Sequence, residues 1–105
     1  MATKVEHNEA GSRYELRVDD RIVGIADYHR IDDVLDFTHT EVVPSHAGRG
    51  LGTVLAVAAL DDVKRQSLSV IPHCWFMRDV IAEHPDQYLA LVPVDRRAQF
   101  RLPVE

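Results

Sequence analysis

The sequence predicts an α/β fold in which an antiparallel meander of strands is followed by a helix, a parallel strand and a second helix. The chain up to Val43 alternates polar and apolar residues between short acidic turns, a pattern typical of strands with one solvated face. A glycine-rich turn then precedes a segment whose apolar residues recur at helical spacing. The apolar run after that helix is expected to pair in parallel, because a crossover helix separates it from the preceding strand.

The meander has three predicted strands and a candidate edge strand. The three strands are residues 13–18, 22–28 and 34–43, and residues 4–7 are the edge strand. Asp19 and Asp20 form the first hairpin turn, and Asp32 and Asp33 form the second, because aspartate favours turn conformations. Short turns join antiparallel neighbours, so these strands should pair in sequence order.

Proline residues mark the ends of the later elements. Pro44 ends the long strand, since proline cannot donate to a strand ladder. The elements expected after it are a helix over about residues 50–66, a buried strand over 67–71, a helix over 75–84 and a last strand over 88–92. Pro72 stops the buried strand and Pro85 stops the second helix. The charged tail over residues 95–103 matches no single element.

Length, composition and charge set the class of protein. A chain of 105 residues, 46% hydrophobic and 28% charged, fits one domain over residues 1–105, with its core over about 13–92. The formal charge of -5 argues against nucleic acid or a membrane surface as a partner. The amino terminus is too polar for a signal peptide, and the longest apolar run, residues 54–60, is far shorter than a bilayer span. We therefore expect a cytoplasmic protein.

Metal binding is not expected from this sequence. Cys74 is the only cysteine, which excludes an intrachain disulfide and a zinc site built from several cysteines. The six histidines do not occur at the spacing of zinc ligands. The aromatic residues Trp75, Phe76, Tyr88 and Phe100 fit a core or a cleft wall better than a surface for stacking bases.

The most informative segment is the turn Gly48-Arg49-Gly50-Leu51-Gly52-Thr53 between the long strand and the first helix. Alternate glycines permit positive φ angles and a close approach of the backbone to a ligand. The first turn of a helix offers free amides and the positive end of the helix dipole, so the segment can bind a pyrophosphate, with a charged contact from Arg49. A tight connection without a ligand explains the same glycines. A Walker loop is excluded because no lysine precedes Thr53, and a dinucleotide-binding turn would follow an early parallel unit.

This turn resembles the cofactor-binding motif of the GCN5-related N-acetyltransferases, Arg/Gln-x-x-Gly-x-Gly/Ala after a β-strand, whose amides hold the CoA pyrophosphate. The segments that resemble a compact branch of that family, in this order, are His39-Thr40-Glu41-Val42, the glycine turn, Ile71-Pro72-His73-Cys74 and His84-Pro85. The resemblance covers about residues 13–92 and implies a GNAT-like acyl-CoA N-acyltransferase fold with acetyl-CoA as cosubstrate. The residues it implies at the cofactor are Thr40, Val42, Ala47, Gly48, Arg49, Gly50, Leu51, Gly52 and Thr53.

The resemblance also assigns main-chain roles and identifies two departures. The amide near Thr40 would polarise the acetyl carbonyl, and Val42 would pair with the pantetheine arm as an added strand. Ala47 stands at the Arg/Gln position of the motif, so one side-chain contact is missing. Ile81 stands at about the place of a tyrosine that often protonates the departing thiolate, and isoleucine cannot donate a proton.

Two strand residues are candidates for the base that deprotonates an ammonium. His39 and Glu41 lie two apart on one strand and therefore project from one face, where either can act directly or through water. Asp36 lies at about the place of the family's strand-borne carboxylate base, but it points to the opposite face unless a bulge intervenes. For each of the three, a hydrogen-bonded or solvated strand residue is the alternative.

Cys74 is a further catalytic candidate, outside the strand. It follows the parallel strand near the start of a helix, where a thiol can become reactive and the adjacent His73 can assist. Cys74 can take the acetyl group covalently or give a proton to departing CoA, and a small buried residue is the alternative. We favour direct transfer, with Cys74 near the cofactor.

The predicted activity is transfer of an acetyl group from acetyl-CoA to a primary amine of a small molecule or a protein. An acyl-CoA-binding module with little or no turnover is the alternative, suggested by Ala47 and Ile81. A structural or interaction domain without a ligand is the second alternative.

Overall fold

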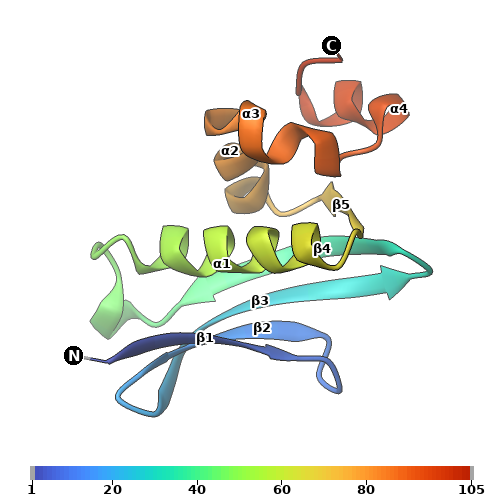
Figure 1. Cartoon of the computed structure of the whole chain (residues 1–105). Helices are drawn as coiled ribbons and strands as arrows, with labels where there is room; N and C mark the ends of the chain where they lie inside the picture. The colour runs from blue at the N-terminus through green and yellow to red at the C-terminus, as the bar shows by residue number, and fades with distance from the viewer. Residues whose placement is uncertain (1, 105) are drawn as a thin grey trace.

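The computed structural model describes residues 2–104, in which a five-stranded sheet has the order β1-β2-β3-β4-β5 (Figure 1). The strands are β1 Thr3–Asn8, β2 Arg13–Val18, β3 Arg21–Ile31, β4 Val34–Val42 and β5 Ser69–Pro72. Strands β1 to β4 pair antiparallel in sequence order, and β5 pairs with β4 in parallel. The predicted meander followed by a parallel strand is therefore confirmed.

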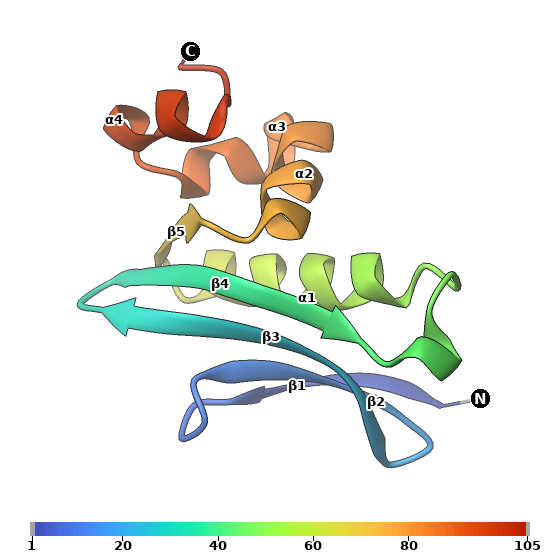
Figure 2. The ribbon, with the colours of Figure 1, turned by 180° about the vertical axis from the view of Figure 1, so that it is seen from behind.

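Two α-helices follow the meander at the predicted places. Helix α1, Leu51–Arg65, lies along one face of the sheet, and α2, Trp75–Glu83, follows β5 (Figure 1). The shorter helical elements are η1 Pro44–His46, α3 Pro85–Tyr88, η2 Leu89–Leu91, α4 Val94–Arg97 and η3 Ala98–Phe100. Seen from behind in Figure 2, the long strands pass in front of α1, and the elements from α2 to α4 lie beyond the β5 edge.

The core lies between α1 and the sheet. The fully buried side chains of α1 are Leu55, Ala56, Ala59, Leu60 and Val63, whose three- and four-residue spacing is that of one helix face. They pack in one cluster with Tyr14, Leu16, Phe37 and Val70 of the strands. The Tyr14 hydroxyl donates to the Asp62 carboxylate at 2.6 Å, and burial together with this bond raises the pKa of Tyr14. The carboxyl-terminal half of α1 is thus fixed to the sheet.

The last predicted strand, residues 88–92, is wrong. Tyr88 ends α3, and Leu89–Leu91 form a 3₁₀ turn. The buried residues of this segment are Tyr88, Leu91 and Val92. Their spacing of three and four residues is that of a helix and not the alternation of a strand. The tail that matched no element forms α4 and η3, and its Phe100 joins the core.

The parallel strand begins at Ser69 rather than at the predicted residue 67. Ser67 has a φ of 58°, and its amide and that of Leu68 donate to the carbonyls of Lys64 and Val63. These two hydrogen bonds close the end of α1 in the manner of a Schellman cap. Ser67 therefore belongs to the helix terminus and is not available to the strand.

Strand β5 pairs with only the first part of β4, and this positions the site. The parallel ladder runs from the Val34–Ser69 pair to the Phe37–Pro72 pair and then stops. Beyond Phe37, β4 keeps β3 on one side and has an open edge on the other. The opening lies beside the start of α1.

Candidate functional site

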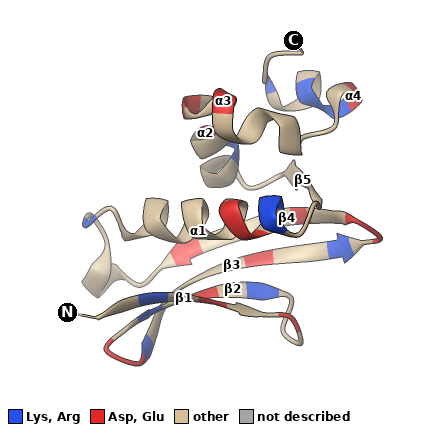
Figure 3. Cartoon of the chain, viewed as in Figure 1, with Lys and Arg blue, Asp and Glu red and all other residues tan. Residues whose placement is uncertain are grey.

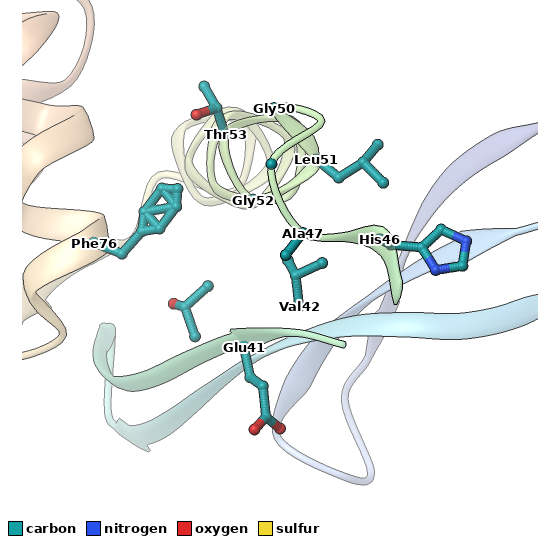
Figure 4. A pocket seen from close by; sticks show the side chains of 11 residues that line it. Glu41, Val42, His46, Ala47, Gly50, Leu51, Gly52, Thr53 and Phe76 are labelled. Atoms are coloured by element: carbon teal, nitrogen blue, oxygen red, sulfur yellow. The ribbon is translucent and has the colours of Figure 1, made fainter. Parts of the chain in front are cut away.

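A cavity of about 330 Å³ lies between the open edge of β4 and the start of α1 (Figure 4). Its lining residues are Thr40, Glu41, Val42, His46, Ala47, Gly48, Gly50, Leu51, Gly52, Thr53 and Phe76. Every residue predicted to contact the cofactor is in this set except Arg49, which is exposed on the turn. The turn, the strand edge and the helix start therefore meet at one place.

The backbone of the turn explains two of its glycines. Gly48 and Gly50 have φ angles of 78° and 73°, a conformation that side chains other than glycine rarely adopt. A Cβ atom added at either position would meet no atom within 4 Å, so conformation and not crowding requires glycine there. Gly50 is the N-cap of α1 and supplies no side-chain cap.

The first turn of α1, which lines this cavity, has unpaired backbone amides. In the region from residue 2 to 104, no acceptor is found for the amides of Leu51, Gly52 and Thr53, and the Val54 amide is the first to bond, to the Gly50 carbonyl at 3.2 Å. The first turn also has no acidic residue. The positive end of the helix dipole is therefore uncompensated, which makes this a favourable place for an anion.

Gly52 has a different role from the other two glycines of the turn. A Cβ atom at Gly52 would lie 2.8 Å from the Phe76 ring of α2, so glycine is needed for the close approach of the two helices. Figure 4 shows the Phe76 ring projecting from α2 toward the cavity, with Val42 pointing into it from β4. Of the two places expected for Phe76, a core or a cleft wall, the structure shows the cleft wall.

Amide groups of β4 face the opening. Val43 donates its amide to the Val23 carbonyl of β3 at 2.8 Å. Because amides alternate in direction along a strand, those of Thr40 and Val42 point to the open edge. They are free to pair with an extended ligand.

A bulge in β4 decides which side chains share a face. Asp27 pairs with His39 but Tyr28 pairs with Phe37, so Thr38 is an extra residue in β4. The bulge reverses the side-chain alternation after Phe37. The side chains on the face toward α1 are Leu35, Phe37, Thr40 and Val42, and those on the opposite face are Asp36, His39 and Glu41. From the sequence, Asp36 shares a face with His39 and Glu41 only if a bulge intervenes. The bulge is present, and the three side chains share a face.

The three predicted catalytic side chains do not meet. His39 and Glu41 are exposed on the face opposite α1, and Glu41 in Figure 4 points away from the cavity that its backbone lines. Cys74 lies on the α1 side, where its thiol donates to the Thr40 hydroxyl at 3.2 Å. Its amide donates to the Phe37 carbonyl at 2.8 Å, at the point where β4 and β5 diverge.

Sequence reasoning missed two features of this region. His46 lines the cavity, although no role was predicted for it. The Asp36 carboxylate accepts a hydrogen bond from His73 Nδ1 at 2.7 Å, across 37 residues of sequence. The only local signal was the position of His73 at the end of the parallel strand, next to Cys74.

The position that corresponds to the family tyrosine lies on the buried side of α2. Ile81 is fully buried in the core, so the place of the family tyrosine supplies no proton. Residues 2–104 contain no group of three His, Cys, Asp or Glu side chains arranged to hold a metal ion. Within the same range, no helix has both the length and the apolar character needed to cross a membrane.

The sheet order, the diverging parallel pair and the glycine turn at the start of α1 define an α/β fold of the N-acetyltransferase type. The sequence profile of the GCN5-related N-acetyl-transferases matches residues 13–91, and the chain belongs to this family. The protein NATD1 of Mus musculus is 34% identical over 90 residues, covering 82% of this chain and 81% of that protein. NATD1 of Homo sapiens is also 34% identical over 90 residues, which cover 82% of this chain and 79% of that protein. Acetyl transfer is therefore the general activity of the family to which this chain belongs.

Solved structures show the same fold. A GCN5-like protein from Staphylococcus aureus, determined by NMR, matches with a TM-score of 0.61 at 20% identity, over 86% of this chain and 87% of that one. The ribosomal-protein-S18-alanine N-acetyltransferase from Escherichia coli matches with a TM-score of 0.52 at 17% identity, over 55% of this chain and 38% of that one. At these identities the likeness is one of fold alone.

Proposed function

We propose that this protein transfers an acetyl group from acetyl-CoA to a primary amine. One observation carries the proposal: the unpaired amides at the start of α1 and the open edge of β4 lie around the same cavity. The helix start suits the pyrophosphate of CoA, and the strand edge suits its extended, amide-bearing arm, which can add to β4 as a strand. The amide near Thr40 would then polarise the acetyl carbonyl.

The cofactor contacts in this proposal are mostly main-chain groups. The residues that would hold CoA are Thr40, Val42, Ala47, Gly48, Arg49, Gly50, Leu51, Gly52 and Thr53, with the Phe76 ring as one wall. Ala47 has no charged group, so the Arg49 guanidinium is the only cation of the turn that can approach the phosphates. Its exposure makes that contact weaker than the amide contacts.

We further propose direct transfer from acetyl-CoA to the acceptor. The amine nitrogen forms a bond to the acetyl carbon, the carbon–sulfur bond breaks, and the CoA thiolate takes up a proton. The thiol of Cys74, which donates to the Thr40 hydroxyl where β4 and β5 diverge, would relay this proton from the nitrogen to the sulfur. A covalent acetyl group on Cys74 is the other route.

Calorimetry with CoA and single-turnover transfer from acetyl-CoA to a panel of primary amines test this function. We expect CoA to bind and radiolabelled acetyl groups to appear on the amine. Absence of CoA binding would overturn the proposal and leave a domain without this ligand. Binding without transfer would instead support the second candidate, an acyl-CoA-binding module, which the missing side chain at Ala47 and the buried Ile81 favour.

Intact mass measurement separates the two routes of transfer. Direct transfer predicts no stoichiometric acetyl adduct after incubation with acetyl-CoA alone, and Cys74→Ser should keep most of the turnover because a hydroxyl can replace the thiol as hydrogen-bond donor. An adduct on Cys74 that an amine discharges at the rate of turnover would establish the covalent route.

We also propose a domain organisation, a class of acceptor and a location for this protein. Residues 1–105 act as one domain, and the acceptor is a small molecule or a protein amine. The free thiol of Cys74 is compatible with a reducing compartment, which supports a cytoplasmic location.

A further inference from the structure

The opening between β4 and β5 has a second set of polar groups on the face opposite α1. The ladder ends at the Phe37–Pro72 pair, and the next two residues, His73 and Cys74, reach opposite faces. Cys74 contacts Thr40 on the α1 side, whereas His73 contacts Asp36, which faces away from α1. The His73 and Asp36 side chains are 43% and 27% exposed, so solvent and small solutes can reach them.

Asp36 fixes the tautomer of His73. An ionised carboxylate can only accept hydrogen bonds, so Nδ1 of His73 carries the proton in the 2.7 Å bond to Asp36. The lone pair is then on Nε2, where the Gln99 amide nitrogen is the donor at 3.5 Å, a long and easily displaced contact. The Phe100 ring packs edge-on against the imidazole at 5.1 Å and limits its rotation.

The free side of His73 opens on a cavity of about 230 Å³. Its lining residues are Pro72, His73, Trp75, Arg78, Gln99 and Phe100. This cavity and the one at the start of α1 are lined by different parts of the chain, apart from neighbouring residues of α2. A molecule in the second cavity would therefore reach the opening without displacing a ligand at the glycine turn.

We propose that His73, positioned by Asp36, takes the proton from the acceptor ammonium, an inference that rests on the proposed acetyl transfer. The acceptor enters through this second cavity. Nε2 of His73 accepts one proton from R-NH₃⁺, and the resulting R-NH₂ forms the bond to the acetyl carbon. The carbon–sulfur bond breaks, and the second nitrogen proton leaves with the CoA thiolate as the thiol. The imidazolium then releases its proton to solvent, so that R-NH₃⁺ and acetyl-CoA give R-NH-acetyl, CoA and H⁺.

His73 fits this role better than the strand residues His39 and Glu41. In the described part of the chain, neither of these side chains has a hydrogen-bond partner, so no contact fixes the tautomer of His39. A neutral imidazole acts as a base through one nitrogen, and of the three side chains only His73 has a partner that fixes which nitrogen is free and where it points.

The charges on this face indicate the class of acceptor. Asp36, Asp27 and Glu41 face it from β3 and β4, and Figure 3 shows acidic segments along both strands and in the turn between them. His39 of β4 is on the same face, and Arg13 of β2 lies opposite Asp27. The charged or titratable groups that share a cavity with the pair are His29 of β3, Asp32 of the turn between β3 and β4, Arg78 of α2 and Arg96 of α4.

The positive charge of Arg78 at this cavity is offset by Asp79, with which it forms an ion pair at 3.0 Å. Its guanidinium already donates to the Phe100 and Arg101 carbonyls and to Asp79. The Arg78 guanidinium lies over the Trp75 ring, 5.7 Å from its centroid, and the ring, which is 64% exposed, offers an apolar surface in the cavity that His73 also lines. This combination suits an alkylammonium, with its carbon chain on Trp75 and its nitrogen at His73.

The test compares His73→Gln and Asp36→Asn with His29→Gln, a matched change of an exposed histidine on the same face. Single-turnover acetyl transfer is measured with a basic alkylamine and with methoxyamine, a weakly basic amine that is neutral at the assay pH and does not need a base to become nucleophilic. We expect His73→Gln to slow transfer to the alkylamine by about 100-fold and to remove the acid limb of its pH–rate profile. Transfer to methoxyamine should fall much less, Asp36→Asn should give a smaller loss of the same kind, and His29→Gln should stay within about twofold of wild type.

CoA affinity separates failure of this inference from failure of the proposed function. Unchanged CoA binding in each variant, measured by calorimetry, shows that the variants fold and retain the glycine-turn site. If His73→Gln does not fold, Asp36→Asn carries the same comparison of the two amines. Equal losses with both amines, full activity of His73→Gln, or a wild-type protein that binds CoA but acetylates no amine of the panel would each overturn the inference. A wild-type protein that binds no CoA would overturn the proposed function itself.

Discussion

The two faces of the opening beside β4 are built from different parts of the chain. On the α1 face, the groups that line the cavity are mostly backbone, with left-handed glycines, unpaired amides and an open strand edge. On the opposite face, the groups are side chains, and the best ordered of them is the His73–Asp36 pair. A backbone site depends on conformation, whereas a side-chain site depends on chemical groups. Substitutions on the two faces should therefore affect CoA binding and acceptor chemistry separately.

The largest expected effect is that of Gly50→Asp on CoA affinity. The substitution places a side chain at a φ of 73° and a carboxylate beside the unpaired amides of α1. Left-handed strain and charge repulsion together should weaken CoA binding by about 100-fold or more, measured by calorimetry. Gly50→Ala is the matched control, because it adds the strain without the charge and has room for its methyl group. A folded Gly50→Asp protein with wild-type CoA affinity would remove the pyrophosphate from this turn.

The backbone face was the more predictable of the two, for a physical reason. The glycine turn, the strand before it and the helix after it are contiguous, so spacing alone predicts where free amides gather. The His73–Asp36 pair depends on parallel pairing across 37 residues and on the extra residue Thr38. Nothing in the local pattern of β4 indicates a bulge, since threonine suits either face of a strand.

The wrong strand at residues 88–92 has a similar cause. The run of Leu89, Ala90, Leu91 and Val92 is compatible with a strand and with a helical turn, because short apolar runs do not distinguish the two periods. Pro85 starts a helical turn instead, and the buried side of that turn is completed by Leu91 and Val92. Tertiary packing decided between two patterns that the sequence allows.

Gly52→Ala should have the next largest effect, through contact between the two helices. The new methyl group would lie 2.8 Å from the Phe76 ring, so the ring must move, and the cavity that it lines would change shape. We expect a net loss of about 1 kcal/mol of stability, because overpacking of roughly 1–3 kcal/mol exceeds the helix propensity gained from alanine. CoA affinity should fall by about tenfold. The double variant Gly52→Ala/Phe76→Leu should regain stability, and if thermal unfolding shows no recovery, the clash is not the cause.

Arg49→Ala should weaken CoA binding by only about fivefold at low salt. Arg49 is exposed and forms no ion pair in the described residues, so its contact with a phosphate would be solvated and screened. Raising the ionic strength should remove the difference between the variant and wild type. The converse change, Ala47→Arg, restores the charged position of the family motif and should tighten binding by a similar factor. A loss in Arg49→Ala that persists at high salt would mean that the side chain contributes through packing.

Glu41→Gln should have the smallest effect, and it distinguishes the two faces at a single residue. The backbone of Glu41 lines the α1-side cavity, but its side chain points to the opposite face. Glutamine keeps the size of the side chain, so CoA affinity should stay within about twofold of wild type. Losing one carboxylate from an acidic face should raise KM for an alkylamine by about two- to threefold at low salt, with kcat unchanged.

Glu9→Gln, in the turn between β1 and β2, gives the same change in net charge away from this face and should leave KM unaltered. Steady-state kinetics on both variants makes the comparison. A fall in kcat of about 100-fold in Glu41→Gln would identify Glu41 as the proton acceptor in place of His73.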